Sequence, residues 1–251
     1  MIKRCRGVHV KRKGTFEEHT INSEYLKEEM KLKVYLPENF SELYKYQFCI
    51  MQDGDDYFQM GRAATLSDEL HESKQISPTI FVGIHYEDKF DRQDKYHPEG
   101  KRQQNYIDFI VNEVVLFLDQ TYPSHCMASC RTLIGDSLAG SLAFMIGCRY
   151  PYTFSNIIMQ SPFVNETVLE EAKKASDFTP LSIYHTIGTK ETEVTTTEGE
   201  VKDFLNPNRE LNKYLERKPF DYTFHEIEGG DHTWGSWQKD FKRGLVTIIG
   251  K

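Results

Sequence analysis

The stretch Leu133-Ile-Gly-Asp-Ser-Leu-Ala-Gly140 constrains the fold of this chain more than any other. An apolar run, 131–134, precedes its turn, and a helix-like run, 141–149, follows it. An apolar strand, a sharp turn that carries a serine, and a helix form the layout of a nucleophile elbow. Small flanking residues allow the turn to close, and the Ser137 hydroxyl can then project toward a base. The stretch therefore makes Ser137 a candidate nucleophile.

The pattern departs from the usual G-x-S-x-G at one position, where Ala139 replaces the second glycine. Gly140 follows directly and offers the close approach of strand and helix instead. An ordinary strand–turn–helix has the same appearance, because glycine and serine are common in turns. A hydrolytic site therefore requires a base, an acid and an oxyanion hole from the rest of the chain.

The remaining segments alternate between strands and helices after an antiparallel beginning. Residues 30–37 alternate apolar and polar side chains, as in a half-exposed strand, whereas 46–52 and 78–84 are apolar runs typical of buried strands. This order predicts an α/β fold in a single domain, 1–251, with a mostly parallel, doubly wound sheet, antiparallel N-terminal strands and helices on both faces. Further strands are expected at 7–12, 15–22, 155–160, 181–188 and 220–227, and helices at 60–71, 106–118, 165–175, 200–217 (broken at Asn206-Pro207) and after 236.

A polar segment, 85–104, is dense in charges of both signs. It is predicted to be a long loop, which is usually functional or mobile. The segment contains five cations, and for an anionic substrate Arg92 and the other four would be candidates for binding it. A solvated loop is the competing interpretation, because acidic residues nearly cancel the positive charge. The other four cations are Lys89, Lys95, Lys101 and Arg102.

Composition limits the classes of function. The net charge of −7 and the lack of a long basic run argue against nucleic acid or an anionic membrane as a partner. The basic N-terminus is not followed by an apolar stretch, so no signal peptide is expected. Five irregularly spaced cysteines indicate reduced thiols in a cytoplasmic protein and favour neither disulfides nor a zinc site. No metal or cofactor is expected, and the oligomeric state, including a homodimer, is left open.

Three side chains with the required chemistry follow the ends of predicted strands. In an open α/β sheet the active residues gather at the carboxyl ends of the strands. Ser137, Glu191 and His232 each follow such an end, and their order of serine, acid and histidine is that of α/β-hydrolases. We therefore expect His232 to act as the base and Glu191 to orient it.

Neighbouring residues leave alternatives for these roles. Glu193 and Glu198 are also candidates for the acid, but Glu191 lies three residues after the glycine that ends its strand. His232 lies between two glycines and two tryptophans, so its loop could carry the imidazole over the elbow. An indole can pack on an acyl or aryl group, so Trp234 is a candidate substrate contact.

The oxyanion hole requires two backbone N–H groups. One is expected from Leu138, the residue after the nucleophile. The other is expected from Asp55, in the loop after the strand at 46–52. The carboxylates of Asp55 and Asp56 should point away from the oxyanion and cap the next helix.

Several motifs together resemble the esterase-D / enterochelin-esterase-like family of α/β-hydrolases, over about residues 28–245. The resemblance implies an α/β-hydrolase fold and a serine ester hydrolase with Ser137, Glu191 and His232 as its triad and no cofactor. Glutamate replaces the commoner aspartate of the family, a change that is harmless to the chemistry. The motifs are Met51-Gln-Asp-Gly54, Gly135-Asp-Ser-Leu-Ala-Gly140, Gly188-Thr-Lys-Glu191 and Gly230-Asp-His-Thr-Trp-Gly-Ser-Trp237, with Val34-Tyr-Leu-Pro37, Val82-Gly-Ile84, Arg92 and Tyr96 as further similarities.

The expected function is hydrolysis of a small-molecule carboxylic ester through an acyl-enzyme intermediate. Two narrower alternatives within the family are a siderophore trilactone esterase and a thioesterase of the S-formylglutathione type. An alternative of another class is a binding protein that keeps the hydrolase fold without catalysis, because a fold alone does not fix function.

Overall fold

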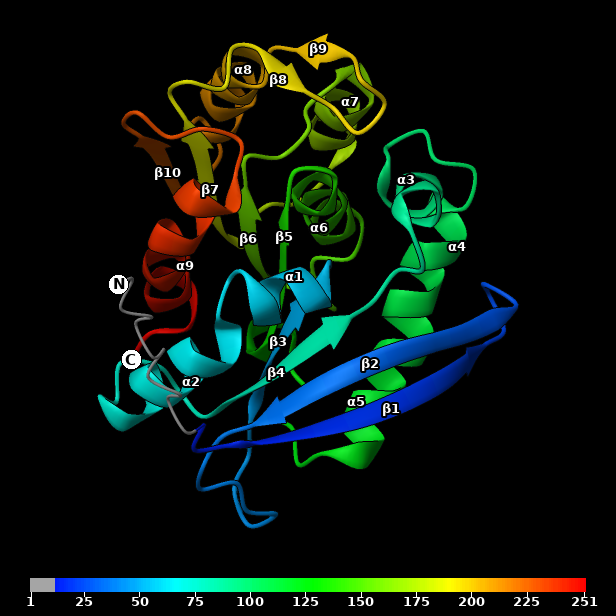
Figure 1. Ribbon diagram of the computed structural model, residues 1–251, viewed down its shortest axis with the longest axis vertical. Helices are drawn as coiled ribbons and strands as arrows, with labels where there is room; N and C mark the ends of the chain where they lie inside the picture. The colour runs from blue at the N-terminus through cyan, green and yellow to red at the C-terminus, as the bar shows by residue number, and fades with distance from the viewer. Residues whose placement is uncertain (1–11) are drawn as a thin grey trace, which may run out of the picture.

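The computed structural model describes residues 12–251 and is built on an eight-stranded sheet, ordered β1-β2-β4-β3-β5-β6-β7-β10 (Figure 1). The pairs β1–β2 and β2–β4 are antiparallel, and the other five pairs are parallel. The fold is therefore the predicted mostly parallel sheet with antiparallel N-terminal strands. The strands are β1 (Thr15–Ser23), β2 (Glu28–Leu36), β3 (Gln47–Met51), β4 (Thr79–Ile84), β5 (Arg131–Asp136), β6 (Asn156–Gln160), β7 (Ser182–Gly188) and β10 (Asp221–Ile227).

Helices cover both faces of the sheet because side chains of a strand point alternately to its two sides. Phe48 and Ile50 of β3 join one buried cluster, whereas Cys49 and Met51 join the other. The first cluster includes α4 (Gln103–Asp108), α5 (Val115–Thr121), α6 (Leu138–Arg149), α7 (Glu166–Lys174) and α8 (Leu205–Leu215). The second includes α1 (Gly54–Gln59), α2 (Ala63–Glu72) and α9 (Trp234–Ile249).

The prediction of a long loop at 85–104 is wrong. Residues Lys89–Tyr96 form helix α3, and the Asp88 side chain caps it by accepting hydrogen bonds from the Phe90 and Asp91 N–H groups. The helix has no apolar stripe from which it could be recognised, and Phe90 is 70% exposed. Because the segment is polar, its sequence does not indicate that it forms a helix.

Two other boundaries differ from the sequence prediction. Pro207 lies in the first turn of α8, where proline costs no helical hydrogen bond, so it does not break a longer helix. Residues Val201–Lys202 before it form a short strand, β9, which pairs with β8 (Val194–Thr195) outside the main sheet.

The predicted helix at 106–118 is part of a longer one, because a π-helical turn at Phe109–Val114 joins α4 to α5. The predicted strand at 7–12 lies almost wholly outside the described residues.

Within residues 12–251, no helix is both long and apolar enough to span a membrane. The four cysteines in this range are free thiols.

His185 of β7 is a buried histidine with a structural role. Tyr222 Oη lies 2.9 Å from its Nδ1, and Asn208 Oδ1 lies 2.6 Å from its Nε2. The amide oxygen is an acceptor, so Nε2 carries the proton and the tyrosine hydroxyl donates to Nδ1. Burial lowers the pKa of His185 to about 4. The folded protein thus holds this residue neutral.

Acid is therefore expected to destabilise the fold through His185. The unfolded chain binds a proton below about pH 6.5 and the folded chain does so only near pH 4, so stability is lost as the pH falls between these values. The loss attributable to this residue is about 3 kcal/mol. Urea unfolding at pH 7 and pH 4 should show a smaller pH dependence in His185→Gln. The exposed His125→Gln is the matched control, and an unchanged pH dependence in His185→Gln would contradict the assignment.

Candidate active site

Ser137 occupies the turn between β5 and α6, as the elbow prediction requires. Its backbone angles, φ 52° and ψ −122°, lie in a region that non-glycine residues rarely adopt. The Ser137 N–H donates to the Gln160 carbonyl (2.9 Å), which ties the turn to the end of β6. Such strain costs about 1–3 kcal/mol and persists only where the surrounding structure enforces it. The backbone conformation is therefore that of the serine in a nucleophile elbow.

The methyl group of Ala139 fits into the elbow because Gly135 has no side chain. A Cβ on Gly135 would lie 2.3 Å from the Ala139 carbonyl carbon and 2.7 Å from the Ala139 Cβ. Gly140 is less restricted, with a Cβ position 3.0 Å from the Gly135 carbonyl oxygen. The alanine in place of the second glycine is thus accommodated. Gly135, in contrast, cannot be replaced by a larger residue without a clash in the turn.

Gly135→Ala is accordingly expected to be destabilising by several kcal/mol, or to prevent folding, because the new methyl group meets main-chain atoms. The double variant with Ala139→Gly should not recover stability, since the backbone contact persists. Gly235→Ala is a suitable control because its Cβ would approach only the Thr233 hydroxyl, at 3.3 Å. Thermal unfolding measures the effect. Wild-type stability of Gly135→Ala would show that the elbow is looser than described.

The side chains of Ser137, His232 and Glu191 form one hydrogen-bonded chain. His232 Nε2 lies 3.0 Å from Ser137 Oγ, and His232 Nδ1 lies 2.6 Å from Glu191 Oε2. An ionised carboxylate only accepts hydrogen bonds, so Nδ1 carries the proton and Nε2 is free to accept from the serine hydroxyl. The three residues selected from the sequence are therefore in contact in the structure.

The competing acids differ from Glu191 in their exposure. Glu191 is 1% exposed, whereas Glu193 and Glu198 are exposed. Gly188 N–H donates to Glu191 Oε1 (2.8 Å), so the glycine that ends β7 also binds the acid. Among the three glutamates, only Glu191 contacts His232 in this structure.

Two further side chains support the acid, and neither was assigned this role from the sequence. Ser161, the first residue after β6, donates its hydroxyl to Glu191 Oε1 (2.6 Å). The Trp237 indole N–H donates to the Ser161 Oγ (2.9 Å), and its ring packs edge-on against His232, with centroids 4.9 Å apart. Only the position of Ser161 at the end of a strand could have drawn attention to it.

The segment proposed for the oxyanion hole begins α1. Asp53 is the N-cap, in the left-handed conformation (φ 56°), and Gly54 packs against Gly83 so closely that a Cβ would lie 2.3 Å from the Gly83 Cα. Asp55 is the second residue of α1, and Leu138 is the first of α6. The first N–H groups of a helix have no partner within it. The backbone donors of Asp55 and Leu138 are therefore not used by their own helices.

The expected side-chain caps of α1 are not found. Asp55 turns toward His85 and Lys33, with shortest distances of 3.3 and 3.8 Å, and the N-cap makes no side-chain cap bond. Asp56 accepts from the Tyr86 hydroxyl (3.4 Å), and burial raises the pKa of its carboxyl group. The Asp55 carboxylate is used in an ion pair with Lys33 rather than as a cap. The prediction that Asp55 and Asp56 cap the helix is therefore wrong.

Arg92 is paired with a carboxylate and also lines the cleft beside Ser137. Its Nε and Nη2 donate to Asp53, at distances of 2.5–2.9 Å. Although burial opposes its charge, the adjacent Asp53 raises the pKa of Arg92. Asp136, the residue before the nucleophile, is also buried, and burial followed by the nearby Asp53 charge raises the pKa of its carboxyl group well above the usual range.

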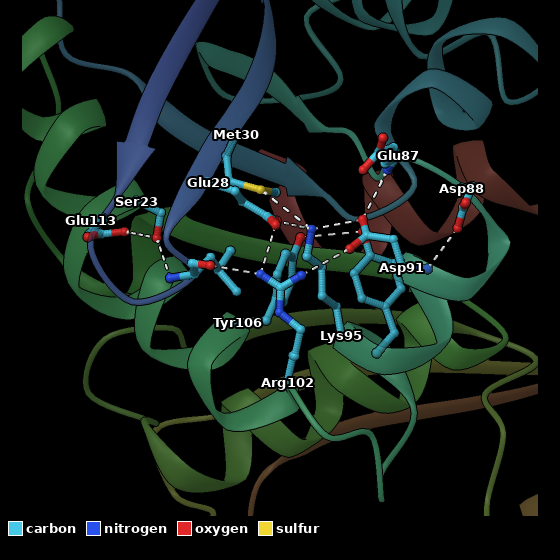
Figure 2. A network of polar contacts seen from close by, with 12 residues as sticks. Ser23, Glu28, Met30, Glu87, Asp88, Asp91, Lys95, Arg102, Tyr106 and Glu113 are labelled. Carbon is cyan, nitrogen blue, oxygen red and sulfur yellow. Dashed lines mark hydrogen bonds and ion pairs between the residues drawn. The ribbon is translucent and has the colours of Figure 1, made fainter.

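An ion-pair network fixes helix α3, which carries Arg92. Lys95 is 2% exposed and contacts Asp91 (2.8 Å), Glu28 and the Met30 sulfur, as Figure 2 shows. Arg102 donates to Glu28 (2.8 Å) and to the Leu26 carbonyl (2.8 Å). Both cations bind α3 and the start of α4 to β2, so they are not free to bind a substrate, the role considered for them from the sequence.

A cavity of about 100 Å³ opens beside Ser137 and His232. Its apolar lining comes from Leu138, Phe163, Val194 and Phe204, and its polar lining includes His97, Lys202 and Glu198. Trp234 is not part of this lining, because its ring packs against Tyr57 and Trp237 at centroid distances of 4.9 and 5.6 Å. The other tryptophan of the loop, Trp237, is the one that touches the histidine.

The sheet order and the strand-end serine, acid and histidine define the α/β-hydrolase class. Residues 23–248 match the family model Esterase, described as "Putative esterase", and the chain belongs to this family. It is 48% identical over 225 residues to YjcH, an uncharacterized protein of Bacillus subtilis (strain 168), covering 90% of this chain and 93% of YjcH.

Several solved structures share the fold at low sequence identity. The BES protein of Bacillus cereus has a TM-score of 0.76 and 19% identity, covering 99% of this chain and 98% of BES. A ferulic acid esterase of Anaeromyces mucronatus has a TM-score of 0.74 and 17% identity, covering 98% and 94%. The enterobactin esterase FES of Shigella flexneri has a TM-score of 0.75 and 19% identity over 93% of this chain, which spans only 59% of FES. These similarities show the fold, and membership of the esterase family identifies the chain as a carboxylic ester hydrolase.

Proposed function

We propose that the protein hydrolyses a small-molecule ester through an acyl-enzyme intermediate on Ser137. The observation that carries the proposal is the hydrogen-bonded chain from the Ser137 hydroxyl through His232 to the buried Glu191. In this chain the imidazole has an unprotonated Nε2 that can take the serine proton, and a carboxylate that stabilises the resulting cation.

The reaction has two halves. His232 removes the Ser137 proton as Oγ attacks the ester carbonyl, and it then protonates the departing alcohol. Water enters, gives a proton to His232 and attacks the acyl group; His232 then passes that proton to the departing Ser137 Oγ, which releases the acid and restores the enzyme. We propose that the N–H groups of Asp55 and Leu138 hold the negative oxygen in both steps. Their position at the N-terminal turns of α1 and α6 supports this role, because helix N-termini favour negative charge.

The walls of the cleft favour an ester with a compact apolar or aromatic group. Phe163 and Phe204 face this space, and the Lys202 ammonium lies 5.2 Å from the centre of the Phe163 ring. The structure of FES was determined in the presence of enterobactin. A siderophore trilactone is accordingly one of the two narrower substrate candidates for this chain. Arg92, Lys95 and Arg102 are already paired with carboxylates, which supports a small ester over a highly anionic siderophore.

A fluorophosphonate and a panel of esters test this proposal. We expect the reagent to add mass at Ser137, and nitrophenyl esters of short or aryl acids to be cleaved faster than long-chain ones. One trilactone and one glutathione thioester in the panel address the two narrower alternatives. The absence of both labelling and turnover would instead favour a binding protein on a hydrolase fold.

Partners and location remain predictions from the sequence. We propose that the main partner is the ester substrate rather than nucleic acid or membrane, and that the protein acts in the cytoplasm. Sedimentation of the purified chain would decide between a monomer and a homodimer.

A further inference from the structure

We infer that Ser161 is a positioning residue for the hydrolytic site, fixing one oxygen of Glu191 so that the other faces His232. The inference rests on the proposed function, since it assigns Ser161 a role in the same reaction. The first observation concerns Glu191. Its Oε1 accepts from Ser161 Oγ (2.6 Å) and from the Gly188 N–H (2.8 Å), while Oε2 lies 2.6 Å from His232 Nδ1. Each carboxylate oxygen thus has a separate set of partners.

The direction of the Ser161 hydrogen bond follows from Trp237. An indole N–H can only donate, and Trp237 Nε1 donates to Ser161 Oγ at 2.9 Å. The serine oxygen accepts this bond and its own proton is directed to Glu191. Because a donor that accepts another hydrogen bond is polarised by it, Trp237 strengthens the bond to the carboxylate. The sequence of donors therefore runs from Trp237 through Ser161 to Glu191.

The backbone holds Ser161 in place for this contact. Ser161 is fully buried and has a positive φ of 45°, an uncommon conformation for a residue other than glycine. Its N–H donates to the Thr186 carbonyl (2.7 Å) on β7, the strand that leads to Glu191. The hydroxyl is thus fixed relative to the acid by the adjacent strand ends rather than by a mobile loop.

Ser161→Ala tests the inference because it removes the hydroxyl and keeps the Cβ, so the backbone constraint is little changed. We expect kcat/KM to fall about 10- to 100-fold, the usual effect of losing a hydrogen bond to a charged group, with KM nearly unchanged. The hydroxyl stabilises the charged carboxylate, so its loss favours protonation of the Glu191–His232 pair. The acidic limb of the kcat/KM profile should therefore move to higher pH.

Two other variants complete the test. Trp237→Phe should move the acidic limb in the same direction by a smaller amount, and it provides the test if Ser161→Ala does not fold. Ser67→Ala removes another buried serine hydroxyl, on α2, and is the control for general destabilisation. A wild-type rate and pH profile in Ser161→Ala, or in Trp237→Phe where the first variant cannot be purified, would overturn the inference. Fluorophosphonate labelling of wild-type Ser137 separates this outcome from failure of the proposed function, which predicts that labelling.

Discussion

Replacing Ser137 with alanine is expected to lower kcat for a nitrophenyl ester by about a thousandfold or more. The proposed function requires a loss of this size, because His232 would then have no nucleophile to activate and the proposed oxyanion donors and binding alone would give only residual catalysis. Steady-state kinetics across several enzyme preparations measure the change. Cleavage at a rate near that of the wild type would show that another group carries the reaction.

A second variant separates lost chemistry from lost structure. Ser137→Gly removes the same hydroxyl and places a glycine at φ 52° and ψ −122°, angles that glycine adopts without strain. We expect this variant to be equally inactive but more stable than Ser137→Ala, by about 1 kcal/mol, in urea unfolding. Equal stability of the two variants would contradict the interpretation that the elbow stores backbone strain.

The contacts among Ser137, His232 and Glu191 could be predicted because each of these residues is marked by a local pattern at the end of a strand. Ser137 lies in a recognisable turn, and Glu191 and His232 each follow a run that reads as a strand. Strand ends converge in a parallel sheet, so their order along the chain was enough to place them together. The same argument does not separate Glu191 from the neighbouring glutamates, whereas its burial in the structure does.

The supporting residues could not be predicted because their contacts join distant segments. Ser161 and Trp237 are 76 positions apart, and Asp53 and Arg92 are 39 apart. Helix α3 is stabilised by its Asp88 cap and by ion pairs of Lys95 rather than by an apolar stripe, so no periodic pattern reveals it. Trp234 was selected for its place beside His232, but the helical geometry of α9 directs its ring toward Tyr57.

Arg92→Met is expected to destabilise the fold by about 3–5 kcal/mol. Asp53 is 2% exposed, and removing its partner leaves a buried carboxylate without a counter-charge, beside a second buried carboxyl group at Asp136. Asp53 also begins the segment that carries the Asp55 N–H, the proposed oxyanion donor. A displaced donor should lower kcat as well. Urea unfolding and steady-state kinetics measure the two effects, and an unchanged midpoint would show that the ion pair is not structurally important.

The double variant Asp53→Asn/Arg92→Met distinguishes the two roles open to Arg92. Removing both charges eliminates the unpaired carboxylate, so most of the lost stability should return. If Arg92 acts mainly by fixing Asp53 and the start of α1, kcat should recover in part and KM should remain near the wild-type value. If instead the guanidinium binds the substrate from its place in the cleft, KM should stay high in the double variant as in Arg92→Met. The geometry favours the first result, because the donors of Arg92 are directed at Asp53 by three contacts of 2.5–2.9 Å.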